Sequence, residues 1–250
     1  NAINRTVEAI AQGQNRAMLV MATGTGKTYT AFQIIWRLWK SGAKKRILFL
    51  ADRNILIDQT MVNDFRPFKG AMAKLSPNAK GVERVDAQGQ ITVEDVDLAV
   101  NKTTKLVDKS YEIYLSLYQA VSGTEEERNI YKQFSPDFFD LIIIDECHRS
   151  IYNLWRQVLE YFDAFLVGLT ATPDNRTYAF FKQNVVSEYT HEQAVADGVN
   201  VGNEVFLIET EVTQNGGTVL KGLVEKREKL TRAKRWEQED EDAKYSGTTL

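Results

Sequence analysis

The sequence has only one cysteine, Cys147, in its 250 residues. A single cysteine cannot build a disulfide framework within the chain, so an intracellular, cytoplasmic compartment is expected. No apolar run approaches the ~20 residues that a membrane-spanning helix needs, and the polar first residues do not match a signal peptide. The sequence therefore predicts no membrane partner.

An excess of positive charge is also lacking. The net charge is −3 at pH 7, and the pI is about 5.6. A basic domain is a common sign of nucleic-acid binding, so any such binding must come from a local basic groove. The 43% of hydrophobic residues is enough for a proper core, which excludes disorder throughout. The length suits either one large α/β domain or one domain plus an appendage, and the missing initial methionine indicates part of a longer protein.

A glycine-rich stretch, MATGTGKT at residues 21–28, follows an apolar run and precedes residues 29–40, where apolar side chains recur at helical spacing. Strand, glycine loop and helix form the context of a phosphate-binding loop. Glycines let backbone N–H groups surround an anion, and the helix N-terminus adds partial positive charge. Lys27 is predicted to reach the β- and γ-phosphates of ATP, and the Thr28 hydroxyl to ligate Mg²⁺. The predicted nucleotide-binding residues are Thr23, Gly24, Thr25, Gly26, Lys27 and Thr28.

Two carboxylates follow another apolar run, residues 138–144, whose Leu-Ile-Ile-Ile segment suits a central parallel strand buried on both faces. Asp145 is predicted to hold hydrated Mg²⁺. Glu146 is predicted to orient and deprotonate the attacking water. The alternative, two charges that cap the next helix, is disfavoured because a phosphate loop is present.

Polar residues also follow two further predicted strands, residues 47–50 and 165–169. Ligands gather at the carboxyl ends of strands in open α/β sheets, which draws attention to Arg53 and Asn54. A helix cap with solvated neighbours explains these two equally well. The hydroxyls of Thr170 and Thr172 can sense a carboxylate or phosphate, although taken alone they indicate only a strand-to-loop turn.

The character of the chain changes after Pro173, and we expect a boundary at residue 190. Beyond it the pattern predicts a helix at 191–197 and a strand at 204–212, with a hairpin turn at 215–217 that lets 218–224 pair back. The dense mixture of charges at 226–242 is most simply a solvated helix or linker.

Four segments together resemble motifs I, Ia, II and III of the first motor domain of superfamily-2 helicases and translocases. They are MATGTGKT, LFLADRNIL, IIIDECHRS and LTATP, in this order and at predicted strand ends. The general phosphate-loop pattern has glycine where this chain has Met21, but the superfamily-2 version A-x-T-G-x-G-K-T does not require it. The resemblance covers about residues 1–189. It implies a RecA-like, three-layer α/β P-loop NTPase domain with a mostly parallel sheet, followed by a C-terminal β-hairpin and helical extension.

Three longer segments resemble the restriction (motor, R) subunit of type I restriction–modification enzymes: DECHRSIYNLW, GLTATPD and VVSEYTHEQAVADG. That family uses ATP and Mg²⁺ to pump double-stranded DNA, which a separate nuclease domain cuts. The resemblance implies specificity and methyltransferase subunits as partners, with a nuclease domain and a second motor domain in the same longer chain. It also implies that His148, Thr170 and Thr172 couple the nucleotide state to the second motor domain. Nucleic-acid contacts are implied near Arg53, Asn54 and Gln119.

Several parts of that family do not occur in this sequence: the nuclease domain, the glutamine-bearing segment that recognises adenine, and the second motor domain with its arginine finger. We therefore expect half of a motor, without nuclease activity of its own. A DNA-repair or RNA helicase module with the same DECH box is an alternative. So is a nucleotide-gated nucleic-acid sensor with little turnover, although the intact Glu146 argues against it. A metabolic kinase would leave LTATP unexplained.

Overall fold

The computed structural model describes residues 1–52, 57–58, 60–61, 63–76, 82–85, 91–94, 96–101, 103–121, 130–150 and 154–202, and the strands between 217 and 245 that are given below. The chain forms two units, Asn1–Gly202 and Asn203–Leu250. The boundary expected at residue 190 therefore lies within the first unit, which includes helix α8 (His191–Ala196). Among the described residues, no helix has the length and apolar character to cross a membrane.

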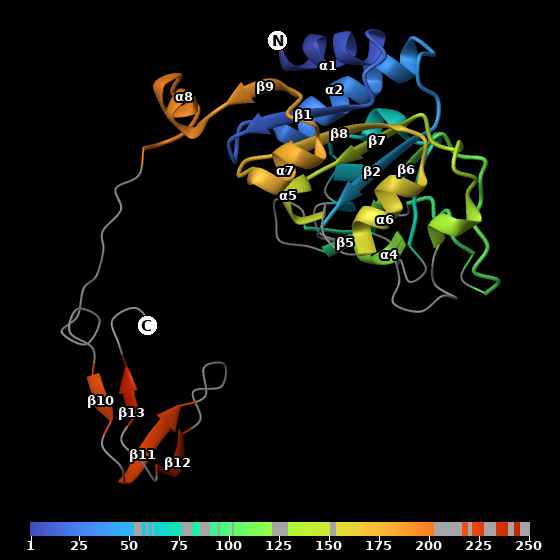
Figure 1. The fold of residues 1–250 in the computed structure, drawn as a ribbon. Coiled ribbons are helices and arrows are strands. Elements are labelled where there is room, and N and C mark those ends of the chain that lie inside the picture. The colour runs from blue at the N-terminus through green and yellow to red at the C-terminus, as the bar shows by residue number, and fades with distance from the viewer. Residues whose placement is uncertain are drawn as a thin grey trace. The chain divides into compact units, whose positions relative to one another are not determined.

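The first unit is built on a seven-stranded sheet in the order β3-β6-β2-β7-β8-β1-β9 (Figure 1). Every pair of neighbouring strands in it is parallel, which confirms the predicted α/β class. In chain order the strands are β1 (Arg16–Met21), β2 (Ile47–Ala51), β3 (Met72–Lys74), β6 (Ile113–Leu117), β7 (Leu141–Ile144), β8 (Phe165–Thr170) and β9 (Val185–Tyr189).

The strands of this sheet are buried on both faces, as their apolar runs predict. All four residues of β7 are fully buried. Along β1, Leu19 and Met21 belong to one hydrophobic cluster, and Met18 and Val20 to another, because alternate side chains of a strand point to opposite faces. The sheet therefore separates two cores.

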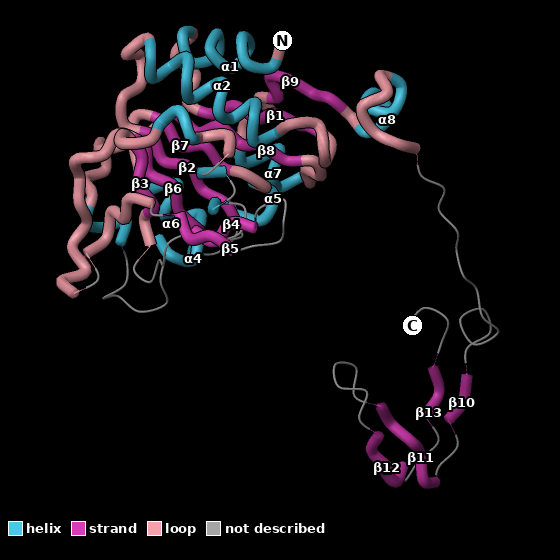
Figure 2. Tube along the Cα trace, turned by 180° about the vertical axis from the view of Figure 1, so that it is seen from behind, coloured by secondary structure: helices cyan, strands magenta, loops and turns pink. Residues whose placement is uncertain are grey.

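Helices cover both faces, giving the three layers expected of this class (Figures 1 and 2). One core includes residues of α1 (Ala2–Ala11), α2 (Lys27–Lys40) and the 3₁₀ turn η1 (Arg66–Phe68). The other includes residues of α4 (Tyr118–Val121), η3 (Ile130–Gln133), α5 (Cys147–Ser150), α6 (Leu154–Tyr161) and α7 (Asn175–Phe180).

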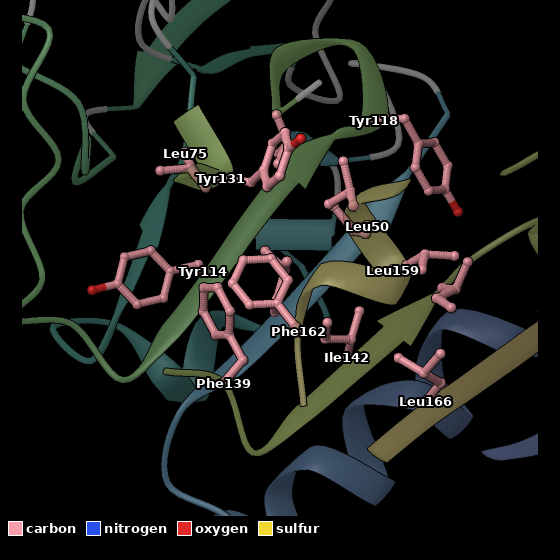
Figure 3. Close-up of a cluster of buried hydrophobic side chains, with 14 of the residues drawn as sticks. Leu50, Leu75, Tyr114, Tyr118, Tyr131, Phe139, Ile142, Leu159, Phe162 and Leu166 are labelled. Atoms are coloured by element: carbon pink, nitrogen blue, oxygen red, sulfur yellow. The ribbon is translucent and has the colours of Figure 1, made fainter. Parts of the chain in front are cut away.

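Aromatic rings fill much of the second core, which Figure 3 shows. The Phe139 ring lies 5.6 Å from that of Tyr114 and 5.0 Å from that of Phe162, both in edge-to-face geometry. Such pairs contribute about 0.5–1.5 kcal/mol beyond their buried area. The packing fixes β6 and β7 against α6, and thereby holds the residues that follow those strands.

Short antiparallel pairs complete the described structure. β4 (Val82–Val85) pairs with β5 (Ile91–Glu94), β10 (Gly217–Val219) with β13 (Ala243–Tyr245), and β11 (Gly222–Arg227) with β12 (Lys234–Glu239). The expectation of a helix or linker across 226–242 is therefore wrong where β11 and β12 lie in this range. A high density of charged residues indicates only that the side chains lie in water, and one face of an antiparallel pair can do the same.

The hairpin predicted for the second unit consists of a strand at 204–212 and a strand at 218–224, and the structure describes only part of it. Thr218 and Val219 pair with Lys244 and Ala243, a partner that the local pattern did not indicate. The expected partner strand at 204–212 lies outside the described residues, as does the turn at 215–216.

Candidate nucleotide site

The predicted site residues follow three adjacent strands. In the order β7-β8-β1, the carboxylates follow β7, Thr170 ends β8, and the glycine loop follows β1. Because parallel strands end at the same edge of a sheet, these segments meet there although they are far apart in the sequence. The central position of β8 separates the glycine loop from the carboxylates by one strand.

The glycine loop forms an open turn at the start of α2. Gly24 and Gly26 have φ angles of 81° and 83°, a left-handed conformation that glycine adopts at little cost. Thr25 closes the turn by donating its hydroxyl hydrogen to the Ala22 carbonyl at 2.7 Å. Within the described part of the chain, the N–H groups of Gly24 and Gly26 donate no hydrogen bond, and no heavy atom other than those of Gly26 and its chain neighbours lies within 4 Å of where a Cβ on Gly26 would be. The loop therefore presents free N–H donors in open space, as an anion site requires.

Lys27 and Glu146 join the loop to the carboxylates. Nζ of Lys27 lies 3.5 Å from Oε1 of Glu146, and only 10% of the lysine side chain is exposed. Glu146 has a φ of 48°, a left-handed conformation that is uncommon for residues other than glycine. This bend occurs directly after β7, where the side chain reaches across β8 toward Lys27.

Asp145 is buried beside this pair, with 7% of its surface exposed. Burial raises the pKa of its carboxyl group to about 6, and the negative charge of Glu146 adds to the increase, whereas the Lys27 charge opposes it. A divalent cation at this carboxylate would favour its ionised form. The group is therefore suited to bind a cation that neutralises it.

Two contacts anchor the chain around the carboxylates. The Tyr118 hydroxyl, at the end of β6, donates to the Asp145 carbonyl at 2.9 Å, and the Tyr118 ring stacks on Trp155 of α6 at 5.3 Å. Arg149 of α5 forms an ion pair of 2.5 Å with Asp52, the residue after β2. The segment after β7 is thus tied to residues that follow β2, the strand beside β7, and β6, the next strand beyond it.

A polar chain leads from Glu146 across the end of β8. Nδ1 of His148 lies 3.6 Å from Oε2 of Glu146 and 2.9 Å from Oγ1 of Thr170. Thr170 Oγ1 in turn accepts the backbone N–H of Thr172 at 3.2 Å. The structure therefore brings together the three residues that the family resemblance assigned to coupling, next to the carboxylates.

The donor set fits a magnesium–nucleotide complex. The loop offers backbone N–H groups, Lys27 offers a positive charge, and Asp145 offers a hard oxygen ligand. No group of three or more His, Cys, Asp or Glu side chains in the described residues could hold a metal ion by itself. Mg²⁺ usually takes only one or two carboxylates, together with phosphate oxygens and water.

The structure does not describe all predicted site residues. Arg53 and Asn54 lie outside the described residues, and Gln119 is placed only as part of the α4 backbone. Conversely, sequence reasoning did not assign roles to Tyr118 or Asp52, which anchor the carboxylates. Their positions directly after β6 and β2 were the available signal, because polar residues at strand ends face the same edge.

Comparisons with known proteins identify the family to which the chain is similar. A family model described as "Type III restriction enzyme, res subunit" matches residues 1–175. The endonuclease subunit of the type I restriction enzyme EcoAI from Escherichia coli is 47% identical over 228 residues, which cover 88% of this chain and 25% of that subunit. The EcoKI endonuclease subunit from Escherichia coli K12 is 29% identical over 243 residues, covering 89% of this chain and 19% of that subunit.

A solved structure is also similar. It is a fragment assigned as the HsdR subunit of a type I restriction enzyme from Vibrio vulnificus YJ016, with 38% identity and a TM-score of 0.55, covering 79% of this chain and 30% of that chain. This chain spans about a quarter or less of the length of the two curated relatives. It belongs to the restriction-enzyme res subunit family, and it is a superfamily-2 motor domain of the kind found in the endonuclease (R) subunits of type I restriction enzymes.

Proposed function

We propose that this chain binds and hydrolyses Mg·ATP as one half of a DNA translocase within a type I restriction endonuclease subunit. The observation that carries the proposal is the 3.5 Å approach of Lys27 Nζ to Glu146 Oε1, beside the buried Asp145. This approach brings the phosphate loop, the proposed base and the proposed metal ligand together at the carboxyl ends of β7, β8 and β1. The alternative of a cap for the next helix would not require this convergence.

Each residue has a proposed task at this edge. Free N–H groups of the loop and the Lys27 ammonium bind the phosphates, while the Thr28 hydroxyl and the Asp145 carboxylate hold the metal. Bound Mg·ATP supplies the phosphoanhydride that is hydrolysed and the divalent charge that offsets the phosphate oxygens. Glu146 accepts a proton from water at a carboxylate oxygen.

Lys27 has two possible partners at this site. Its Nζ lies near Glu146, and the phosphate oxygens of a bound nucleotide would compete for this ammonium and leave Glu146 available as a base. Oε2 of Glu146 faces Nδ1 of His148, which contacts Thr170. A movement of the Glu146 side chain would therefore alter the contacts of His148 and Thr170 at the end of β8. This is consistent with a coupling role for His148, Thr170 and Thr172.

The wider function follows from the named relatives. EcoAI and EcoKI are type I restriction enzymes, and both similar proteins are their endonuclease subunits. For this chain we propose double-stranded DNA as the track, with specificity and methyltransferase subunits as partners. A second motor domain and a nuclease domain of the same longer protein would complete the machine, and the nuclease activity would reside there. Arg53, Asn54 and Gln119 remain proposed DNA contacts.

The test is ATPase activity with and without DNA, measured for this chain and for a longer chain that adds the second motor domain. Lys27 and a bound metal would neutralise only part of the charge on the transferring phosphoryl group, and an arginine finger in the opposing domain would contribute about 10³–10⁵-fold in rate. We expect this chain to bind ATP, hydrolyse it very slowly and not move along DNA. Comparable DNA-stimulated rates in both chains would contradict the half-motor proposal. Stimulation by RNA alone would favour an RNA helicase.

A further inference from the structure

The turn that follows α8 has a defined backbone. Gly198 has a φ of 70°, and its N–H bonds to the Val195 carbonyl at 3.0 Å. The N–H groups of Val199 and Asn200 both bond to the Ala194 carbonyl, at 2.8 and 3.0 Å. Figure 1 shows α8 directly beyond β9, the edge strand that pairs with β1. These bonds fix where the Asn200 side chain begins.

The Asn200 side chain contacts the phosphate loop, 177 residues earlier in the sequence. Its Nδ2 donates to the Thr23 carbonyl at 3.1 Å. Its Oδ1 lies 3.4 Å from the position that a Cβ on Gly24 would take. The neighbouring valines, Val199 and Val201, are 55% and 88% exposed, whereas Asn200 is half-buried. This order is the reverse of the usual burial preference, so the turn positions the amide rather than the apolar side chains.

His191, the first residue of α8, completes the contact. Its Nδ1 lies 3.4 Å from Asn200 Nδ2. Because an amide nitrogen only donates, Nδ1 of His191 is the acceptor in this contact. Both hydrogens of the amide are thus directed to acceptors, Thr23 and His191, which fixes the orientation of the side chain.

We propose that Asn200 is a positioning residue of the phosphate loop, which sets the direction of the Gly24 N–H group. A trans peptide is planar, and its C=O and N–H point to opposite sides. No cis peptide occurs among the described residues, so the carbonyl of Thr23 held by Asn200 determines where the N–H of Gly24 points. That N–H is one of the free donors of the loop. The inference rests on the proposed nucleotide site and adds a residue that no motif contains.

Without the Asn200 amide, the peptide between Thr23 and Gly24 would no longer be held in one orientation. The ligand would then have to order this peptide on binding. Glycine has more conformational freedom to lose than any other residue, so the cost would appear as weaker phosphate binding. Nothing in the contact involves a nucleoside. The effect should therefore be the same for Mg·ATP and for inorganic magnesium tripolyphosphate.

Asn184 provides a matched control. Its Nδ2 donates to the Arg16 carbonyl at 2.6 Å, at the opposite end of β1, and it is half-buried like Asn200. Asn184→Ala and Asn200→Ala thus remove the same group and the same kind of hydrogen bond from the two ends of one strand. Both variants should lose similar thermal stability, which a melting curve measures.

The experiment is calorimetric titration of the 250-residue chain with Mg·ATP and with magnesium tripolyphosphate. We expect Asn200→Ala to weaken both ligands by about tenfold, and Asn184→Ala to change neither by more than about twofold. Asn200→Asp should bind both more weakly than Asn200→Ala, because it places negative charge beside the Thr23 carbonyl and the phosphates. It also serves as the second variant if Asn200→Ala does not fold.

The outcomes separate this inference from the proposed function. If the unmodified chain binds neither ligand, the proposed nucleotide site is wrong, and the role of Asn200 falls with it. If that chain binds both ligands and Asn200→Ala binds them equally well, the positioning role alone is wrong. Weaker binding of ATP but not of tripolyphosphate would also overturn it, since Asn200 would then act on the nucleoside.

Discussion

The Nζ atom of Lys27 lies 3.5 Å from Oε1 of Glu146, although the two residues follow strands that are separated by β8. This pair brings a cation of the phosphate loop next to a carboxylate of the DECH segment. The structure thus supplies the convergence of charges on which the proposed ATPase chemistry depends.

Glu146→Gln should preserve Mg·ATP binding and abolish most turnover. The amide keeps the shape of the side chain but cannot accept the proton, and a positioned base contributes about 10²–10⁴-fold. The measurement is steady-state ATPase activity in a chain that includes the second motor domain. Glu160→Gln, which changes an exposed glutamate paired with Arg156, is the matched control. Unchanged turnover in Glu146→Gln would remove this residue from the role of base.

Asp145 should make the nucleotide-free protein less stable as pH rises. Its pKa is about 6 in the folded chain, above the value of 3.8 for a free side chain, so the folded state holds the proton more tightly. Stability is therefore lost between about pH 4 and pH 6, and a difference of roughly two pKa units corresponds to about 3 kcal/mol. We expect Asp145→Asn to be more stable than the unmodified protein at pH 7 and equally stable below pH 4.

Denaturant unfolding in EDTA, at a series of pH values, measures this effect. Asp163→Asn, at an exposed carboxylate, should change the free energy of unfolding by less than about 0.5 kcal/mol at every pH. Parallel pH curves for the unmodified protein and Asp145→Asn would show that burial does not alter the titration of Asp145.

Tyr118→Phe should impair the use of Mg²⁺ beyond its effect on stability. The change removes the hydroxyl that donates to the Asp145 carbonyl and keeps the ring that stacks on Trp155. Tyr114→Phe is a close control, because the Tyr114 hydroxyl also donates to a backbone carbonyl, that of Asp108 at 3.1 Å. Each variant should lose about 0.5–1.5 kcal/mol of stability.

The readout is the Mg²⁺ concentration that gives half-maximal ATPase activity. This Mg²⁺ concentration should rise severalfold in Tyr118→Phe and stay constant in Tyr114→Phe. Of the two tyrosines, only Tyr118 bonds to the backbone of Asp145, the proposed metal ligand. Equal values in the two variants would limit Tyr118 to a structural role.

Local motifs indicated the centre of the candidate site, because a glycine loop and a pair of carboxylates carry their chemistry within a few residues. The strand runs around them also predicted the parallel sheet. The position of β8 between β7 and β1 determines which side chains meet, and local patterns do not contain this order. Asn200 was missed for the same reason, since it contacts Thr23 through the fold and not through any spacing. The helix or linker expected across 226–242 was wrong where β11 and β12 lie, because charge does not determine backbone pairing.

Calorimetric titration of Lys27→Ala with Mg·ATP tests the central claim, that residues 23–28 and the carboxylates after β7 form an ATP site. The substitution removes the side-chain cation of the phosphate loop, whereas Lys45→Ala removes an exposed lysine after α2. We predict that the affinity of Lys27→Ala falls at least tenfold, or about 1.4 kcal/mol, and that Lys45→Ala matches the unmodified chain. Superimposable titration curves for all three proteins would contradict the claim and place the nucleotide elsewhere.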